Sequence, residues 1–232
     1  HAEARELRAG DSIDILLVSA FAETITVSGI RADEQTPVTA TEIRRQEIER
    51  RYHQQDIPLL VRDTPSISAW AESGLGSSGY SYFTLRGISP TRINFTLDGV
   101  PLADSEDFGT YFVDFPDLAH SIQSIQIQRG VGTSSVGSPS FGGSVNFESI
   151  DLSRTPEMHV RLAGGSFGQA FGTAAYQTGS LAGGYSLYTR VSYNESDGFR
   201  ESSDIRQRNL FVSAAKQNEN SLIKLTGFSG RE

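Results

Sequence analysis

Residues 185–194 read YSLYTRVSYN and alternate between two kinds of side chain along their whole length. Successive side chains of a β-strand point to opposite faces of its sheet. One face would therefore carry the mostly apolar set Tyr185, Leu187, Thr189, Val191 and Tyr193. The other would carry the polar set Ser186, Tyr188, Arg190, Ser192 and Asn194. Aromatic residues at both ends of the apolar face are typical of a membrane β-barrel strand, although a β-sandwich strand shows the same alternation.

Four further strand-like runs flank this stretch, at residues 159–163, 170–177, 209–216 and 222–229. The connection at 181–184 is short, whereas the one at 195–208 is longer and charged, as in the hairpins of barrels. Five strands cannot close a barrel, and an open set leaves two unpaired edges. If these are barrel strands, we expect most of the barrel to lie beyond residue 232 and the chain to be a fragment.

The composition narrows the class of protein. The chain has 232 residues, of which 37% are hydrophobic and 21% are charged, and this is not the composition of a disordered protein. A formal net charge of −8 makes it a poor nucleic-acid binder, since phosphate contacts need clustered Lys and Arg. No cysteine is present, which excludes disulfides and zinc–thiolate sites. No apolar run approaches the roughly 18 residues of a membrane helix.

The residues before position 156 have a different pattern. Strand-like runs at 82–85, 93–97, 122–128 and 144–147 are separated by Gly, Ser and Asp clusters, which indicates a small α+β domain. The run TATE at 39–42 fits a capping box and predicts a helix through about Arg51. A second short helix is expected from Asp56, with Leu59 and Leu60 facing inward and an end before Pro65.

Three motif matches fail on their context. The glycine run GLGSSG at 74–79 precedes a strand, whereas a dinucleotide fingerprint must open a helix. A hydrolase acting through Ser166 needs a downstream His, and the last His of the chain is His159. The four histidines have no zinc-ligand spacing, and the acidic run at 104–107 lacks the spacing of a calcium loop. Together with Asp114 and Asp117, this run is interpreted as a solvated acidic loop, with weak calcium binding as the alternative. We therefore expect neither a catalytic nor a metal site.

Five short stretches occur in a distinctive order along the first 147 positions. They are ETITV at 23–27, FTLRGI at 83–88, NFTLDGVPL at 94–102, IQSIQIQRGVGTSS at 122–135 and GGSVN at 142–146. Together they resemble the TonB box and four plug motifs of the TonB-dependent outer-membrane receptor/transporter family. Gln123, Gln126 and Val131 depart from the common pattern, which suggests a subgroup.

The resemblance implies a fold and a domain order. The expected fold is an α+β plug domain followed by the first strands of a transmembrane antiparallel β-barrel, with about 22 strands in the full protein. The expected segments are the tail of a β-sandwich-like extension resembling a carboxypeptidase-regulatory-like domain (1–22), the TonB box (23–29), a linker (30–38), the plug (39–150) and the start of the barrel (151–232).

The resemblance also implies a function without bond-making chemistry or a cofactor. The family transports a scarce ligand, most often a ferric siderophore, across the outer membrane of a Gram-negative bacterium. The partner would be periplasmic TonB with its inner-membrane energising complex. TonB would bind an extended segment by β-strand addition, and the binding residues would be Glu23, Thr24, Ile25, Thr26 and Val27. Outer-membrane lipid would surround the barrel.

Two further sets of site residues are implied. The predicted contacts between plug and barrel are Arg86, Gly87, Asp98, Gly99, Arg129 and Gly130. The two arginines would pair with wall carboxylates or else face solvent, and Asp98-Gly99 would form a hairpin turn in which the glycine accepts a positive φ.

Aromatic residues on two loops, 68–82 and 103–112, are the candidates for ligand contact. They are Trp70, Tyr80, Tyr82, Phe108, Tyr111 and Phe112. The alternative for these rings is that they pack beneath barrel loops and do not contact a ligand. The alternative function is a β-rich surface binding module or adhesin without transport, which would fold as a stable soluble protein from these residues alone.

Overall fold

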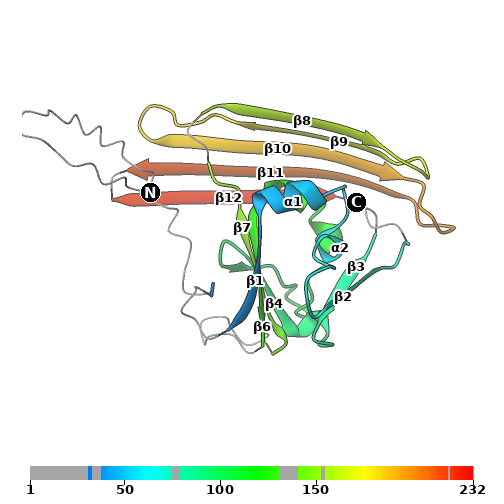
Figure 1. Ribbon diagram of the computed structural model, residues 1–232. Helices are drawn as coiled ribbons and strands as arrows, with labels where there is room; N and C mark the ends of the chain where they lie inside the picture. Colours follow the sequence, from blue (N-terminus) through cyan, green and yellow to red (C-terminus); the bar gives the residue numbers. More distant parts are fainter. Residues whose placement is uncertain are drawn as a thin grey trace, which may run out of the picture.

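The computed structural model describes residues 31–32, 38–74, 79–130, 141–152, 155–218 and 220–231. They form two parts. An amino-terminal domain, residues 38–152, lies against one face of a curved sheet of five long strands, which we term the wall sheet (Figure 1). The chain passes from the first part to the second near residue 155.

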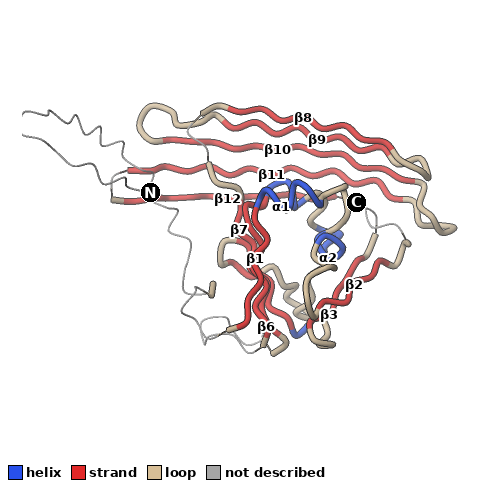
Figure 2. Tube along the Cα trace, viewed as in Figure 1, coloured by secondary structure: helices blue, strands red, loops and turns tan. Residues whose placement is uncertain are grey.

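The amino-terminal domain is built on a mixed five-stranded sheet in the order β1-β6-β7-β4-β5. β4 and β7 run parallel, and the other neighbours are antiparallel. A separate two-stranded hairpin, β2–β3, stands beside it (Figure 2). The elements are β1 (Thr39–Arg44), α1 (Arg45–Arg51), α2 (Ile57–Leu60), β2 (Ile67–Ala71), β3 (Ser81–Leu85), η1 (Pro90–Arg92), β4 (Ile93–Leu97), β5 (Val100–Pro101), η2 (Phe112–Asp114), η3 (Leu118–Ser121), β6 (Ile122–Arg129) and β7 (Gly143–Ser149).

Four phenylalanine rings run through the core of this domain. Phe83, Phe95, Phe112 and Phe147 meet edge to face, with ring centroids 5.5, 5.5 and 6.3 Å apart. Fully burying a side chain of this kind contributes about 1.5–3 kcal/mol. Aliphatic side chains of α1 and of strands β1, β4 and β6 fill the space around the rings. This core holds the β2–β3 hairpin and the sheet together.

The first predicted helix begins later than the sequence indicates. Residues Thr39–Arg44 form β1, and the helix covers only Arg45–Arg51. No side-chain cap bonds the helix start, so the predicted capping box is wrong. The competing interaction is the ladder with β6, in which Thr39 lies opposite Arg129 and Arg44 opposite Ser124. β-branched residues at 39, 41 and 43 fit this strand, and Ile43 is buried there.

The second helix agrees with its prediction. α2 spans Ile57–Leu60 and begins directly after Asp56. Leu60 is buried and Leu59 is half-buried.

Asp98 and Gly99 have φ of 48° and 84° and join β4 to β5, so the predicted hairpin turn is confirmed.

The wall sheet consists of β8 (Glu157–Gly164), β9 (Ala170–Gln177), β10 (Tyr185–Ser196), β11 (Ile205–Asn218) and β12 (Ser221–Arg231). All neighbours are antiparallel and follow one another in chain order. Each predicted strand is present, and four of the five are longer than predicted, because ladder pairing extends past the alternating core of each run. β8 and β12 each keep one edge unpaired among the described residues.

The two faces of the wall sheet have the polarity opposite to that of a soluble protein. The apolar face points away from the amino-terminal domain, and its Leu162 and Leu225 are 81% and 75% exposed. The polar face points inward, and its Arg190 and Ser213 are completely buried. A β-sheet with an apolar outer face and a polar inner face is typical of a sheet whose outer face contacts lipid. Among the described residues, no helix combines the length and the hydropathy needed to cross a membrane.

Gly143→Ala is expected to destabilise the protein by about 3 kcal/mol. A Cβ at this position would lie 2.3 Å from Gln128 O and 2.6 Å from Leu85 Cδ2, and φ is 145°. Gly87→Ala is the matched control, since its φ is 77° but no atom lies within 4 Å of the added carbon. It should cost only about 1 kcal/mol. Urea unfolding of the full-length protein in detergent measures both, and equal losses would contradict the packing argument.

Candidate functional site

A buried ion pair joins the inner face of the wall sheet to the amino-terminal domain. Nη1 of Arg190, on β10, lies 2.9 Å from Oδ2 of Asp117, which directly precedes η3. The two side chains are 0% and 3% exposed. The Arg190 guanidinium also donates to Asn209 on β11, so that the arginine is held from the wall side as well.

Asp117 is the centre of a small network within its own domain. The Tyr52 hydroxyl donates to Asp117 Oδ1 over 2.8 Å, and Nδ1 of His120 contacts the same oxygen. The rings of Tyr52 and His120 meet edge to face at 4.7 Å. One carboxylate therefore links α1, η3 and the wall sheet.

The electrostatics of this network keep it charged at neutral pH. Burial raises the pKa of Asp117, but the charge of Arg190 and the hydrogen bond from His120 outweigh burial, so that the pKa lies below its ordinary value. Burial and the neighbouring Asp117 raise the pKa of the Tyr52 hydroxyl well above its ordinary value. Asp117 thus accepts as a carboxylate while Tyr52 remains a donor.

Apolar contacts accompany the ion pair. Tyr188 on β10 and Phe211 on β11 point inward and belong to the same buried cluster as the core of the amino-terminal domain. Their rings lie 6.0 Å apart, and the Tyr188 hydroxyl reaches His120 O over 3.4 Å. The interface between the wall sheet and the amino-terminal domain is therefore polar at Arg190 and apolar at Tyr188 and Phe211.

A second charged contact lies at the predicted turn Asp98-Gly99. The carboxylate of Asp98 accepts from the backbone N–H and the hydroxyl of Ser149. Its Oδ2 lies 3.5 Å from Nζ of Lys224 on β12. β12 also approaches closely at Gly230, where a Cβ would lie 2.5 Å from Asp114 O.

The other predicted contact residues lie at the end of β6 away from the wall sheet (Figure 1). Arg129 donates from Nε to Pro65 O and also bonds the Thr41 hydroxyl. Arg86 and Gly87 form a turn with φ of 54° and 77°. Gly130 has φ of 104° and lies beside the Arg86 guanidinium. Neither arginine forms an ion pair with a carboxylate in the part of the wall that the structure describes.

Four of the predicted ligand-contact residues come together in what we term the aromatic surface: Trp70, Tyr80, Tyr82 and Tyr111. Trp70 and Tyr82 lie on the β2–β3 hairpin with ring centroids 5.7 Å apart. Tyr80 stacks on Tyr82 at 6.2 Å and meets Tyr111 edge-on at 6.2 Å. The predicted loop at 68–82 is instead mostly strand, since β2 ends at Ala71 and β3 begins at Ser81, and the ladder pairing of these segments is what aligns the rings. Trp70 and Tyr80 are nearly half exposed on this surface.

The second loop differs from its prediction at one position. Phe108 is exposed with a φ of 60°. Phe112, by contrast, is 4% exposed and belongs to the phenylalanine core, so its prediction as a ligand contact is corrected. The reason is that Phe112 begins η2, whose Phe112 and Val113 turn inward. The Tyr111 hydroxyl bonds Asp107, which raises the pKa of Tyr111 to about 12 and lowers that of Asp107.

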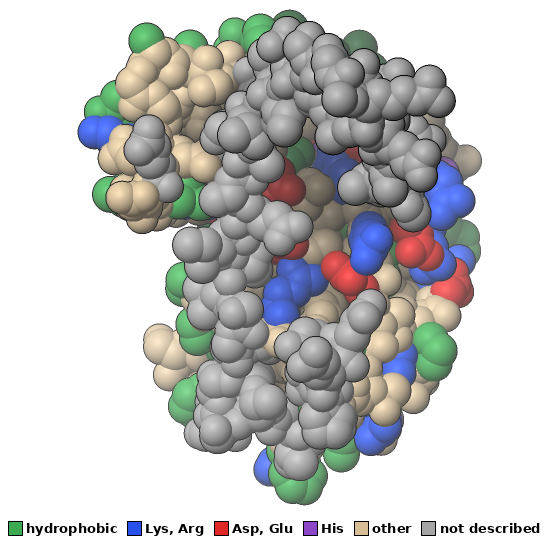
Figure 3. Space-filling model, turned by 60° about the vertical axis from the view of Figure 1, so that its left-hand side comes forward, with side chains coloured by type: hydrophobic (Ala, Val, Ile, Leu, Met, Phe, Trp, Pro, Cys, Tyr) green, Lys and Arg blue, Asp and Glu red, His purple; other side chains and the backbone are tan. Residues whose placement is uncertain are grey.

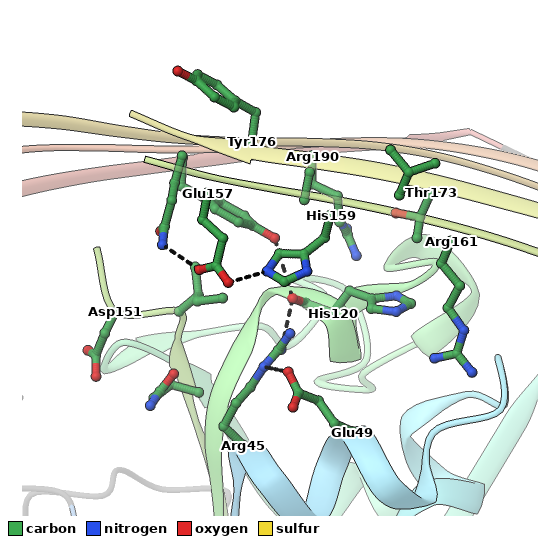
Figure 4. A pocket seen from close by; sticks show the side chains of 16 residues that line it. Arg45, Glu49, His120, Asp151, Glu157, His159, Arg161, Thr173, Tyr176 and Arg190 are labelled. Atoms are coloured by element: carbon green, nitrogen blue, oxygen red, sulfur yellow. Dashed lines mark hydrogen bonds and ion pairs between the residues drawn. The ribbon is translucent and has the colours of Figure 1, made fainter. Parts of the chain in front are cut away.

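A cavity of about 630 Å³ separates α1 from strands β8–β10 (Figure 4). Its charged side chains have local partners. Arg45 pairs with Glu49 at 2.7 Å and donates to His120 O, while His159 pairs with Glu157 at 2.8 Å. Across the described residues, no three His, Cys, Asp or Glu side chains are grouped to hold a metal ion. The cavity is a polar gap between domain and wall.

Residues 31–32 are fastened to the amino-terminal sheet. Arg31 Nη1 lies 2.8 Å from both Ser124 Oγ and Glu148 Oε2. The backbone N–H and carbonyl of Ala32 bond the Gln126 amide over 2.8 Å each. On the face turned forward in Figure 3, acidic and basic side chains are interspersed. Residues 1–30, including Glu23, Thr24, Ile25, Thr26 and Val27, lie outside the described part of the chain.

The sequence analysis did not identify the network around Asp117. It treated Asp117 as part of a solvated acidic loop and Arg190 as one polar residue of a strand. A signal was present, since an arginine in the middle of a strand's polar face needs a counter-charge when that face is buried. Locating the counter-charge required the tertiary structure.

Comparison with known proteins shows which family and which relatives this chain is similar to. A family model described as TonB-dependent Receptor Plug Domain matches residues 32–144. A probable hemoglobin and hemoglobin-haptoglobin-binding protein 4 of Haemophilus influenzae is 30% identical in an alignment over 128 residues that covers 50% of this chain and 12% of that protein. Hemoglobin-haptoglobin utilization protein B of Neisseria meningitidis is 28% identical over 125 residues, 47% of this chain and 15% of that protein.

Solved structures share the fold at low identity. The ferripyoverdine receptor of the outer membrane of Pseudomonas aeruginosa superposes with a TM-score of 0.68 at 19% identity, covering 84% of this chain and 25% of that one. The copper transporter OprC superposes with a TM-score of 0.66 at 16% identity, covering 82% and 30%. The chain therefore spans only a small part of the proteins that it resembles.

Arg190→Ala is expected to destabilise the full-length protein in detergent by about 3–5 kcal/mol, because it leaves Asp117 buried without its counter-charge. The double variant Arg190→Ala with Asp117→Asn removes both charges, keeps an amide oxygen that can accept from the Tyr52 hydroxyl, and should recover most of that loss. Urea unfolding of the single and double variants measures the difference. A double variant as unstable as Arg190→Ala would show that the ion pair is not the source of the effect.

The same network predicts a dependence on acid. Because the folded-state pKa of Asp117 is lowered, its contribution is fully present above the unfolded value of about 3.9 and is lost as the pH falls through the folded-state pKa. The free energy of unfolding, measured from pH 7 downward, should fall more steeply in the wild type than in Asp117→Asn. Parallel profiles would contradict the assignment.

Proposed function

This chain belongs to the family of TonB-dependent receptors of the Gram-negative outer membrane, and from that membership we propose that it takes up a scarce ligand across this membrane. The observation that carries the proposal is the wall sheet, whose polar face seats the amino-terminal domain while its apolar face points outward. In the full protein the amino-terminal domain would be the plug of a barrel with about 22 strands.

The plug would be held by contacts that can be released. The described contacts include the buried pair Arg190–Asp117 and the pair Lys224–Asp98. An ion pair in a buried site contributes less net stability than its Coulomb attraction suggests, since both charges lose their hydration. Arg129 is the last residue of β6, whose end lies away from the wall sheet (Figure 1), and the Arg86 guanidinium lies beside the following Gly130. We propose that both arginines face the remaining barrel strands.

Energy would reach the plug through the residues before Arg31. We propose that Glu23, Thr24, Ile25, Thr26 and Val27 add as a strand to periplasmic TonB, which is driven by its inner-membrane complex. Tension on that strand would first load Arg31 and Ala32, whose bonds to Ser124, Gln126 and Glu148 lead directly into β6 and β7. No bond-making chemistry would be involved.

We propose that the ligand contains iron and binds over the aromatic surface. A ferric siderophore is the ligand expected of the family, and similar folds include the receptor bound to ferripyoverdine. Haemoglobin is a second candidate, because relatives at 28–30% identity are named for binding or using it. The rings of Trp70, Tyr80 and Tyr82 suit either a catecholate-type or a porphyrin-type aromatic plane.

Growth on a single iron source separates the two ligands. The full-length gene would be expressed in a Gram-negative host that lacks its own iron receptors, and haemoglobin or a ferric siderophore would be supplied as sole iron. Growth on one source assigns the ligand class. Binding without growth on any source would support the adhesin alternative and would refute transport.

Ile25→Pro is expected to abolish uptake while leaving ligand binding unchanged. Proline removes the N–H that residue 25 would donate to the ladder with TonB. Ile25→Val is the matched control, since it keeps the N–H and the β-branched shape and should transport normally. Uptake of radiolabelled iron and equilibrium binding to whole cells are the two measurements. Normal uptake by Ile25→Pro would rule out coupling through this segment.

A further inference from the structure

The loop between β10 and β11 has a braced conformation. Its residues 197–204 read DGFRESSD. The Ser203 hydroxyl accepts from Arg200 N over 3.1 Å and donates to Arg200 O over 2.6 Å. Gly198 has a φ of 79°, and a Cβ there would lie 2.1 Å from Ser203 Oγ. These contacts present Phe199 and Arg200 together at the tip of the loop.

The preceding wall hairpin supports this loop from one side. Asp197 N donates to Phe167 O over 2.8 Å, and the Ser196 hydroxyl donates to the same oxygen over 3.3 Å. The rings of Phe167 and Phe199 meet edge to face at 5.3 Å. The β8–β9 and β10–β11 loops therefore form one unit at this end of the wall sheet.

The tip of the loop contacts the β2–β3 hairpin of the plug. Arg200 Nη1 donates to Glu72 O over 2.6 Å. Phe199 Cδ1 lies 3.2 Å from the position that a Cβ of Gly74 would occupy. Glu72 directly follows β2, and its N–H bonds Tyr80 O over 2.9 Å. The contact thus falls on the part of the hairpin that carries Trp70 and Tyr80.

The hairpin needs such a contact because it pairs with no other described strand. β2 and β3 form a sheet of their own, and a lone two-stranded hairpin is marginally stable. Phe83 and Leu85 hold its base in the core, and at the opposite end the Ser81 hydroxyl, next to Tyr80, donates to Asp56 over 2.8 Å. Trp70 and Glu72 belong to the other side of that end. Contacts at that end decide where the aromatic surface points.

We infer that Phe199 and Arg200 are positioning residues, which clamp the β2–β3 hairpin to the wall loops and so fix the aromatic surface in place. The role of that surface in ligand binding rests on the proposed function, whereas the clamp itself does not. The clamp is exposed and consists of one charge-assisted hydrogen bond, from Arg200 to Glu72 O, and the approach of the Phe199 ring to Gly74.

The test is a distance measurement in the full-length receptor without ligand. Glu72→Cys, directly after β2, and Lys216→Cys on β11, away from the clamp, would be spin-labelled, since both side chains are exposed and residues 1–232 contain no cysteine. Pulsed electron–electron double resonance should give one narrow distance distribution. Phe199→Ala with Arg200→Ala should broaden it about twofold, because the released hairpin end samples more positions. An unchanged distribution would overturn the inference.

Two further variants distinguish positioning from general stability. Arg200→Lys keeps a charged donor and should restore most of the narrow distribution. Arg206→Ala removes an arginine on the outer face of β11 and should leave the distribution unchanged. The thermal unfolding midpoint should be the same in all variants. A broader distance distribution in Arg206→Ala would overturn a positioning role. So would a lower unfolding midpoint in the Phe199→Ala, Arg200→Ala variant, because general destabilisation would then explain its broader distribution. Because no ligand is used, an incorrect ligand assignment would leave this result intact.

Discussion

The polar inner face of the wall sheet must be matched by polar groups on the domain that it covers. A sheet whose outer face is apolar has to place its polar side chains inward, toward the domain that it covers. Arg190 is the extreme case, because it is completely buried and would carry an uncompensated charge without Asp117. The position of η3, and with it the way the amino-terminal domain is seated, follows from this requirement.

The same requirement explains why the two parts can be held together and still be separable. A dry apolar interface resists separation because its free energy depends on the area removed from water. Charged contacts such as Lys224–Asp98 can exchange their partners for water as the parts move. Tyr188 and Phe211 add a limited apolar contact. This combination suits the proposed transport function, in which a plug would close the pore at rest and change its contacts under tension.

In the proposed function, ligand binding and tension would reach the same packed core of the amino-terminal domain from two different sides. The aromatic surface lies on the β2–β3 hairpin, which shares the phenylalanine core with β4 and β7. Arg31 and Ala32 are fastened to β6 and β7 by side-chain hydrogen bonds. A ligand on the first site and tension on the second would therefore act on the same packed layer. The clamp formed by Phe199 and Arg200 adds the wall loops to this arrangement.

Residues that depend on local alternation could be predicted from sequence, whereas residues that depend on remote partners could not. The strand at 185–194, the turn at Asp98-Gly99 and the helix after Asp56 follow from period, glycine and proline, which act over a few residues. Thr39–Arg44 was predicted as a helix because its capping box is local, but its ladder partner β6 is far away in sequence. Phe112 was placed in an exposed loop for the same reason.

The amino-acid sequence by itself determined the two-part organisation, the alternating polarity of the wall strands and the family, because periodicity and short motifs are written into consecutive residues. Only the tertiary structure decided that Arg190 meets Asp117, that four aromatic residues from two loops form one surface, and that Arg200 reaches Glu72. These are pairings between segments far apart along the chain, and their energies depend on burial and distance, which exist only after the chain has folded.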